Sequence, residues 1–288
     1  MSALRSERPA HPPLRRTLGM WAVTALVIGN MIGSGVFTLP SALADIGPVS
    51  LLGWALTGVG AILLALVFAS LGRAVPRTGG PYAYARRAFG DFAGFWTAWG
   101  YWIAVWAGNA AIATSFVAYL AVFWPAVGTD HLLAVVVATG AIWLLTLVNV
   151  IGAREAGLVQ LATTVLKLVP LALIGLVGLF FMHSGHFTPF APGVHGVSSG
   201  LSTLSAAGAL TLWAFIGLES ATVPAEEVHD PRRTLVRATI IGTVVTTIVY
   251  VIATVAVLGI VPRETLLASG SPFADAAHIM FGGGWDKV

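Results

Sequence analysis

Charged side chains are scarce in this sequence. Only 9% of its 288 residues are Asp, Glu, Lys or Arg, whereas 57% are hydrophobic, and the mean hydropathy is +0.87. A soluble domain carries roughly 25% charged residues, which keep its surface hydrated. The composition therefore excludes an ordinary soluble domain and predicts an integral membrane protein whose solvent is the lipid bilayer.

Cysteine is absent, which excludes disulfide bonds and thiolate metal ligands. Three histidines, His183, His186 and His195, lie close together in the sequence, but their spacing does not resemble a zinc motif. No Ser–His–Asp set falls at membrane depth, and no phosphate-binding loop is present. We therefore expect no metal and no cofactor, and we rank an intramembrane enzyme as the weaker alternative from another functional class.

Long runs without charge predict the membrane-spanning helices, because a bilayer core is crossed by about 20 apolar residues in helical form. The first such run lies between Arg16 and Asp45. An eighth apolar segment begins near Pro272, and the sequence ends at Val288 before this segment could cross. Seven complete spans are predicted, at about 18–42, 45–73, 91–124, 131–154, 158–181, 200–225 and 237–263.

The predicted organisation has three parts: an N-terminal arm (1–17), a transmembrane bundle of seven helices (18–263), and an outer loop with the incomplete eighth helix (264–288). Arginines occur in the arm and after the second, fourth and sixth spans, whereas the opposite loops hold only Arg263. The positive-inside rule then predicts a multi-pass protein of the cell (inner) membrane with a cytoplasmic N-terminus. The net charge of +3 reflects this topology, so nucleic acid is not an expected partner.

Glycines interrupt the first predicted span. Gly33 and Gly35 flank Ser34 near the middle of the membrane. Each glycine weakens a helix by about 1 kcal/mol relative to alanine, and it allows a ligand or a second chain to approach the backbone. A broken helix is one interpretation, and close helix packing of the small-residue kind is the other.

The sixth predicted span favours the broken-helix interpretation. It carries Gly217 two residues before Glu219. An ionised side chain at the bilayer centre costs at least about 2.5–3.5 kcal/mol, so such residues usually have a role. That role could be functional, or Glu219 could be a structural carboxylate bonded to nearby backbone amides.

Two interrupted helices that lie five helices apart are typical of transporters built from inverted five-helix repeats. Broken helices expose N–H groups, which attract a carboxylate, and carbonyl groups, which suit an ammonium. An amino acid presents both of these groups. The pattern therefore predicts an all-α membrane transporter with an incomplete 5+5 inverted repeat, broken in helices 1 and 6.

Three motifs, in the same order and at similar spacing, resemble those of the amino acid–polyamine–organocation permeases. The first lies in helix 1, the second follows helix 2 and the third lies in and after helix 6. They are Gly33-Ser34-Gly35-Val36-Phe37 with Pro40; Gly79-Gly80-Pro81-Tyr82-Ala83-Tyr84 with Phe89-Gly90; and Phe215-Ile216-Gly217-Leu218-Glu219 with Glu226-Glu227 and Asp230-Pro231-Arg232-Arg233. The resemblance covers almost the whole chain and implies a fold of about twelve helices.

Within this superfamily the sequence is most similar to the arginine/agmatine and basic amino-acid antiporters. The resemblance implies secondary active transport of amino acids or amines, by alternating access around the two broken helices. It implies that Ser34 and Gly35 hold the substrate carboxylate and that Glu219 is a proton-sensitive carboxylate. The full set of implied substrate-binding residues is Met31, Gly33, Ser34, Gly35, Tyr101, Ala104, Asn109, Trp213, Ile216 and Glu219.

Lys167 departs from the antiporter pattern, because it lies inside the predicted fifth span. Proton-coupled permeases that resemble this chain have a lysine in this helix, where its ammonium takes the place of a sodium ion beside broken helix 1. The alternative function is therefore a proton-coupled amino-acid symporter that uses Lys167. A structural alternative is that Lys167 snorkels to the membrane interface. The resemblance is compatible with protons as coupled ions and with a homodimer.

Overall fold

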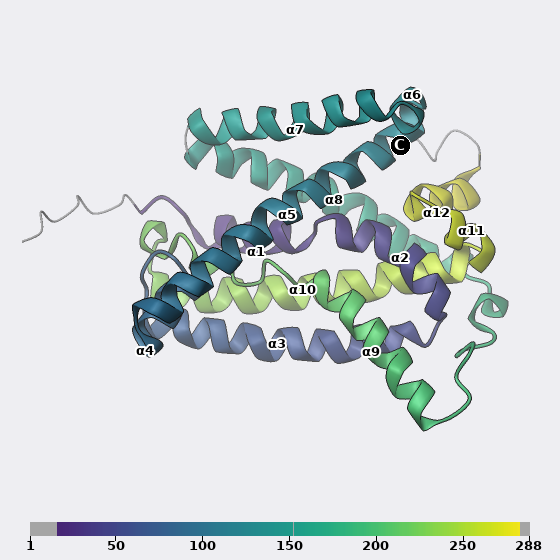
Figure 1. The fold of residues 1–288 in the computed structure, drawn as a ribbon, viewed down its shortest axis with the longest axis horizontal. Helices are drawn as coiled ribbons and strands as arrows, with labels where there is room; N and C mark the ends of the chain where they lie inside the picture. The colour runs from purple at the N-terminus through teal and green to yellow at the C-terminus, as the bar shows by residue number, and fades with distance from the viewer. Residues whose placement is uncertain (1–15, 152, 283–288) are drawn as a thin grey trace, which may run out of the picture.

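The computed structural model describes residues 16–151 and 153–282, and within these ranges the regular elements are helices, apart from one β-bridge between Leu18 and Val228 (Figure 1). The predicted N-terminal arm lies almost wholly outside the described residues. In chain order the helices are α1 (Met20–Met31), α2 (Ser34–Ile46), α3 (Ser50–Ala74), α4 (Pro81–Phe89), α5 (Asp91–Phe123), α6 (Ala126–Thr129), α7 (His131–Ile151), α8 (Ala153–Gly178), η1 (Leu179–Phe181), η2 (Ser184–Phe187), α9 (Val197–Trp213), η3 (Ser220–Thr222), η4 (Ala225–Glu227), α10 (Pro231–Ile260), α11 (Arg263–Ala268) and α12 (Pro272–Phe281).

Six segments of the described chain are long and apolar enough to cross a membrane, which confirms an all-α, multi-pass membrane protein. Five of them match the second, third, fourth, fifth and seventh predicted spans, and the first combines α1 and α2. The six segments are Met20–Ile46, Ser50–Ala74, Asp91–Phe123, His131–Ile151, Leu158–Phe181 and Pro231–Ile260.

The sixth predicted span is not one continuous helix. Regular α-helix stops at Trp213, and tight turns with two short 3₁₀ helices carry the chain on to Glu227. Gly217 explains part of this interruption, because its φ of +110° is incompatible with an α-helix and is rarely adopted by other residues. The predicted span over 200–225 is therefore broken, as the sequence indicated, and its regular α-helix covers only Val197–Trp213.

The seventh helix begins earlier than the charge pattern predicted. α10 starts at Pro231 and so includes the arginines that precede the apolar run. Proline is favoured at the first position of a helix, since its fixed φ suits the helix and its missing N–H would have no intrahelical partner. The charged first turns of α10 therefore extend beyond the apolar part of the span.

α10 is the central helix of the bundle. It packs along α3, with which it lies side by side in Figure 1, and also against α1 and α8. Trp54 of α3, Phe215 and Tyr250 form an aromatic cluster with ring centroids 5.2–5.8 Å apart, and all three are almost completely buried. This cluster fixes α3 and α10 against the interruption that follows α9.

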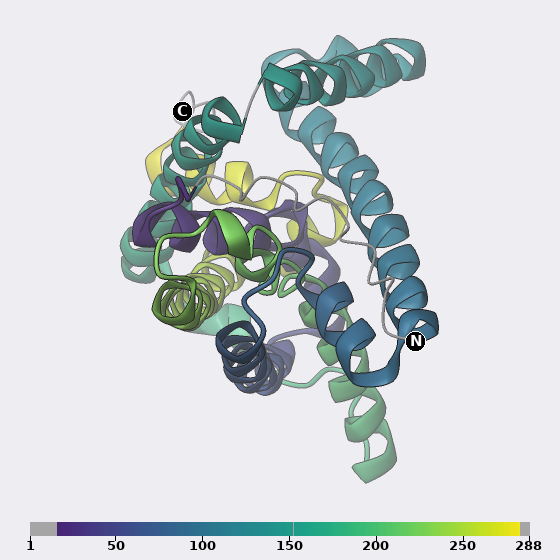
Figure 2. The same ribbon diagram turned by 90° about the vertical axis from the view of Figure 1, so that its left-hand side faces the viewer.

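α7 lies at the outer edge of the bundle, in both views (Figures 1 and 2). None of its residues is buried, and its exposed side chains are mostly Leu, Val, Ile and Trp. α5 is almost as exposed, with only Gly94 and Ala113 buried. In a lipid solvent such surfaces are compatible with a stable fold, which explains why the sequence can be apolar all around these helices.

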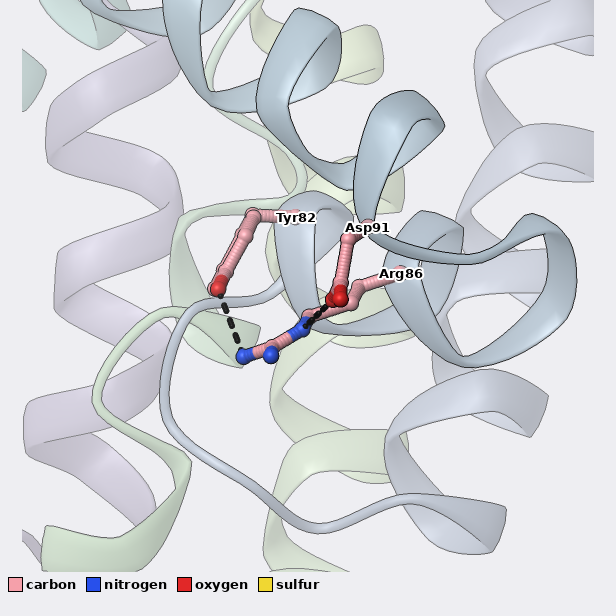
Figure 3. A network of polar contacts seen from close by, with 3 residues as sticks. All are labelled: Tyr82, Arg86 and Asp91. Carbon is pink, nitrogen blue, oxygen red and sulfur yellow. Dashed lines mark hydrogen bonds and ion pairs between the residues drawn. The ribbon is translucent and has the colours of Figure 1, made fainter.

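A short polar network joins α4 to the start of α5 (Figure 3). The Arg86 guanidinium donates to Asp91 Oδ1 at 2.6 Å and to the Tyr82 hydroxyl at 3.0 Å. The ion pair spans the turn at Gly90, and it contributes little stability because it is exposed. On the other face of α4, burial raises the pKa of Tyr84, and the nearby Thr222 hydroxyl offsets part of this increase.

Candidate functional site

The two helix interruptions lie against each other at the centre of the bundle. A Cβ atom added to Gly217 would be 2.8 Å from the carbonyl carbon of Asn30, at the end of α1. A Cβ atom added to Gly35, in the first turn of α2, would lie 3.2 Å from Trp213 Cδ1. The glycines thus allow two backbones to approach more closely than side chains would permit.

The first interruption exposes backbone N–H groups at the start of α2. Its N-cap is Gly33, which has no side chain that could accept a hydrogen bond from the N–H groups of the first turn. These N–H groups have no intrahelical partner, and they lie at the positive end of the helix dipole. The N-terminus of α2, with Ser34 and Gly35 in its first turn, is therefore suited to bind a carboxylate.

The carbonyl groups at the end of α1 are already occupied by Lys167. The Lys167 ammonium, from α8, donates hydrogen bonds to the carbonyls of Gly29 and Ile32, each at 2.7 Å. A positive charge at the C-terminal end of a helix is stabilised by the helix dipole. The side chain is directed to the break in helix 1, so snorkelling to the membrane interface does not describe Lys167.

Tyr250 of α10 contacts both interruptions, and the sequence analysis did not identify it. Its hydroxyl is a hydrogen-bond partner of the Met31 carbonyl, at the end of α1, and it lies 3.0 Å from the Ala214 carbonyl, just beyond α9. A hydroxyl has a single proton, so it donates fully to one carbonyl at a time. The sequence signal that could have identified Tyr250 is its position as a tyrosine inside an otherwise apolar span.

Glu219 lies beside the second interruption and is half-buried. Its Oε2 atom accepts a hydrogen bond from the Gly217 N–H at 3.1 Å, and the carboxylate interacts with the Tyr101 hydroxyl of α5. The bond to a backbone amide is the one expected of a structural carboxylate. Tyr101, however, lies on α5, so its contact with Glu219 also joins α5 to the second interruption.

Both interruptions line a cavity of about 1190 Å³. All ten predicted substrate-binding residues line it, although their binding roles stay predictions. Lys167 does not line it and lies behind the helix 1 break. The ten lining residues are Met31, Gly33, Ser34, Gly35, Tyr101, Ala104, Asn109, Trp213, Ile216 and Glu219.

Other polar residues also line this cavity and were not singled out from the sequence. Asn30 precedes the first interruption, Asn149 lies on α7, and Ser220 begins η3. An asparagine inside a span that is otherwise apolar was a usable signal for Asn149. Asn30 and Ser220 lie next to the glycine motifs in the sequence, and this proximity was the usable signal for both residues.

The described residues hold no group of three or more His, Cys, Asp or Glu side chains that could bind a metal ion. His183 and His186 lie with ring centroids 5.5 Å apart, and His186 Nδ1 is 2.9 Å from the Gly259 carbonyl. These two histidines therefore have local partners in the loop that follows α8.

This architecture, with two interrupted helices around one cavity, defines a class of multi-pass α-helical membrane proteins. The family model for amino acid permeases matches residues 18–287, and the chain belongs to this amino acid permease family. This is the family that the three sequence motifs resemble.

Curated relatives share about a third of the sequence. The chain is 35% identical over 267 residues to the cadaverine/lysine antiporter of Escherichia coli (strain K12), covering 93% of this chain and 59% of that protein. It is 37% identical over 262 residues to the arginine/ornithine antiporter of Pseudomonas aeruginosa, covering 88% and 54%. It is 33% identical over 271 residues to the putrescine transporter of Escherichia coli (strain K12), covering 92% and 60%. The chain thus spans only 54–60% of the length of these three relatives.

Proposed function

We propose that the chain forms the substrate-binding part of an antiporter for cationic amino acids and related amines, which works by alternating access around its two interrupted helices. The observation that carries this proposal is the meeting of both interruptions at one cavity, with uncapped N–H groups on one side and a carboxylate on the other. Such a pair of groups is complementary to an amino acid.

The polar groups of the cavity suit different parts of the substrate. The N–H groups at Ser34 and Gly35 would hold the carboxylate. The Ile216 carbonyl accepts no hydrogen bond from the described residues, so it is available to an ammonium. Glu219 would attract a second ammonium and respond to protons. This assignment fits a cationic amino acid better than a neutral one, and a diamine would use only the Ile216 carbonyl and Glu219.

Tyr101, Ala104 and Asn109 would form the α5 wall of the substrate site, and Trp213 and Ile216 would form the opposite wall. The side chains of Trp213 and Ile216 are 46% and 51% exposed, which leaves apolar surface available to the methylene groups of a long substrate. Met31 and Gly33 would bound the site at the helix 1 break.

Two of the three relatives carry the word antiporter in their names, which favours exchange over proton-coupled symport. From the symport alternative we retain the proposal that the Lys167 ammonium takes the place of a bound cation, because it occupies carbonyls that such a cation would need. Coupling to protons through Lys167 and Glu219, and assembly as a homodimer, are further proposals.

Ligand binding tests the proposed substrate class. Lysine, arginine, ornithine, cadaverine and putrescine would be titrated into the purified chain, with leucine as a neutral competitor. Glu219→Gln should weaken binding of the cationic ligands by about tenfold or more, because a charge-assisted contact is worth about 1.5–3 kcal/mol. Glu264→Gln, an exposed change on α11 outside the cavity, is the matched control. Equal affinities of the two variants would refute the role of Glu219, and preference for leucine would refute the substrate class.

The proposed orientation, with a cytoplasmic N-terminus in the bacterial inner membrane, has a direct test in this cysteine-free chain. Ala88→Cys on α4 and Ser184→Cys after α8 introduce single exposed thiols. In intact cells a membrane-impermeant maleimide should label the Ser184→Cys variant and should label the Ala88→Cys variant only after permeabilisation. The reverse labelling pattern would invert the proposed topology.

A further inference from the structure

A second cavity, of about 430 Å³, is lined by residues at the end of α3 and the start of α10. These two helix ends lie at the end of the bundle that also holds α4 (Figure 1). The second cavity is separate from the cavity at the helix interruptions, since the two have no lining residue in common. Four of its six lining residues are arginines: the full lining is Arg73, Asp230, Arg232, Arg233, Val236 and Arg237.

The positive charges of this cavity are only partly compensated. Arg233 lies 3.8 Å from Asp230, in an exposed ion pair within the first turn of α10. Arg73, Arg232 and Arg237 form no ion pair and no side-chain hydrogen bond with any residue in 16–151 or 153–282. Three guanidinium groups around one cavity repel one another and have donors to spare, so the site is suited to an anion with several oxygen atoms.

The backbone that carries these arginines is fixed by the protein core. Gly72 packs against Leu235, and a Cβ added to Gly72 would lie 3.4 Å from Leu235 Cδ1. Leu235 is completely buried, and the Thr234 hydroxyl donates to the His229 carbonyl at 2.7 Å. The arginines of α3 and α10 therefore project from a rigid junction rather than from a mobile loop.

The cavity adjoins an apolar surface of the kind that faces lipid. Along α10, Arg237 is followed at four-residue intervals by Ile241 and Val245, which are 40% and 37% exposed. Residues four apart lie on one face of a helix. On α3, Leu66 is 44% exposed and lies two turns before Arg73, on the same face. A molecule with an anionic head and an apolar tail would contact the arginines and this surface together.

We propose that the cavity between α3 and α10 binds the phosphate group of an anionic phospholipid, with the acyl chains lying along α10. The anion recognition comes from the guanidinium groups, which match phosphate oxygens in a bidentate manner. The membrane, rather than free phosphate, is the expected source of the ligand, because the cavity lies at the ends of two long apolar helices and the exposed apolar residues Leu66, Ile241 and Val245 share a helix face with Arg73 or Arg237. Basic pockets between membrane helices are known to bind lipid headgroups in this way.

The experiment measures lipid binding to the purified chain in detergent by native mass spectrometry, with the thermal unfolding temperature as a second readout. Phosphatidylglycerol, phosphatidylcholine and inorganic phosphate are the three probes. The Arg73→Gln/Arg237→Gln variant is compared with Arg77→Gln/Arg87→Gln, which removes the same charge near the same end of the bundle but outside the cavity. Each arginine near an anionic lipid is worth about 1 kcal/mol, or roughly fivefold in affinity.

Phosphatidylglycerol should bind more tightly than phosphatidylcholine and should raise the unfolding temperature. The cavity variant should lose roughly 25-fold in affinity for phosphatidylglycerol, as two contacts of about 1 kcal/mol predict, while the control variant retains most of it. Equal losses in the two variants would show attraction by net charge alone and overturn the site. Binding of inorganic phosphate as tight as that of phosphatidylglycerol would overturn the lipid as ligand. If the double variant does not fold, the affinity of Arg237→Lys for phosphatidylglycerol is measured instead. This change keeps the charge but loses the bidentate contact, so it should still weaken binding, and an unchanged affinity would overturn the site.

Discussion

The Lys167 ammonium is bonded to two carbonyl oxygens of a single helix end, those of Gly29 and Ile32, each at a distance of 2.7 Å. One side chain of α8 thereby satisfies backbone acceptors that the break in helix 1 leaves without intrahelical partners. The break and the lysine depend on each other, since a partly buried ammonium needs these acceptors as much as the acceptors need a donor.

Replacing Lys167 by Met should therefore destabilise the protein. Methionine fills a similar volume but leaves the two carbonyls unpaired, and each buried unsatisfied group costs about 1–3 kcal/mol. Chemical denaturation of the purified chain, followed by the loss of helical circular dichroism, measures the change. Lys167→Arg keeps the charge and the donors, so it should lose less stability than Lys167→Met. A Met variant as stable as the wild type would show that the break does not require the ammonium.

Removal of the Tyr250 hydroxyl should weaken the contact between the two interruptions. Tyr250→Phe keeps the ring in the cluster with Trp54 and Phe215 but leaves the Met31 and Ala214 carbonyls without this donor. The expected loss of unfolding free energy is about 1–3 kcal/mol. Tyr82→Phe, a change in the exposed network of Figure 3, should stay within about 0.5 kcal/mol of the wild type. Similar effects of the two changes would refute a special role for Tyr250.

Gly217 should tolerate no side chain. Alanine at this position would adopt a φ of +110° and would place its Cβ 2.8 Å from the Asn30 carbonyl carbon. Strained backbone of this kind costs about 1–3 kcal/mol, and the clash adds to this cost. The matched control is Gly100→Ala on α5, where an added Cβ meets no atom within 4 Å and helix propensity favours alanine. Thermal unfolding of both variants should show a loss for Gly217→Ala and no loss for Gly100→Ala.

Alkaline pH should destabilise the folded protein through Tyr84 of α4. Burial raises the pKa of Tyr84 above its usual value of 10.0, so the folded state retains the phenol proton more firmly than the unfolded state does. The contribution of the protonated Tyr84 phenol to the free energy of unfolding is therefore fully present below pH 10. It is lost as the pH rises through the higher folded-state pKa. Unfolding temperatures measured from pH 8 to pH 12 should decrease less steeply for Tyr84→Phe than for the wild type. Parallel curves for the two proteins would show that Tyr84 does not titrate differently in the folded state.

The sequence predicted the position and order of six of the seven spans well, because the bilayer imposes a length of apolar helix that is visible as an absence of charge. The limits of α10 were predicted less well. Apolar runs mark the part of a helix in lipid, whereas Pro231 and the arginines that follow it belong to the same helix beyond that part.

The candidate site was also largely predictable, but for a different reason. Glycines and an intramembrane carboxylate are improbable in a simple span, so Gly33, Gly217 and Glu219 identified the interruptions directly. Tyr250 was missed because its importance comes from the two carbonyls that it contacts, Met31 and Ala214, and these are 219 and 36 residues away in the sequence. A pattern within one helix cannot report such a partnership.

The shortness of the half-helices has a consequence for the biosynthesis of the protein. α1 has 12 residues and α2 has 13, so each is only about 18–20 Å long and neither alone crosses a bilayer core of about 30 Å. The donors that cover the break, Lys167 and Tyr250, are synthesised more than a hundred residues later. While the ribosome is still making α3 to α7, the first segment must enter the membrane as a continuous helix or with its break shielded by other protein. The break therefore acquires these two donors only after α8 and α10 have been synthesised.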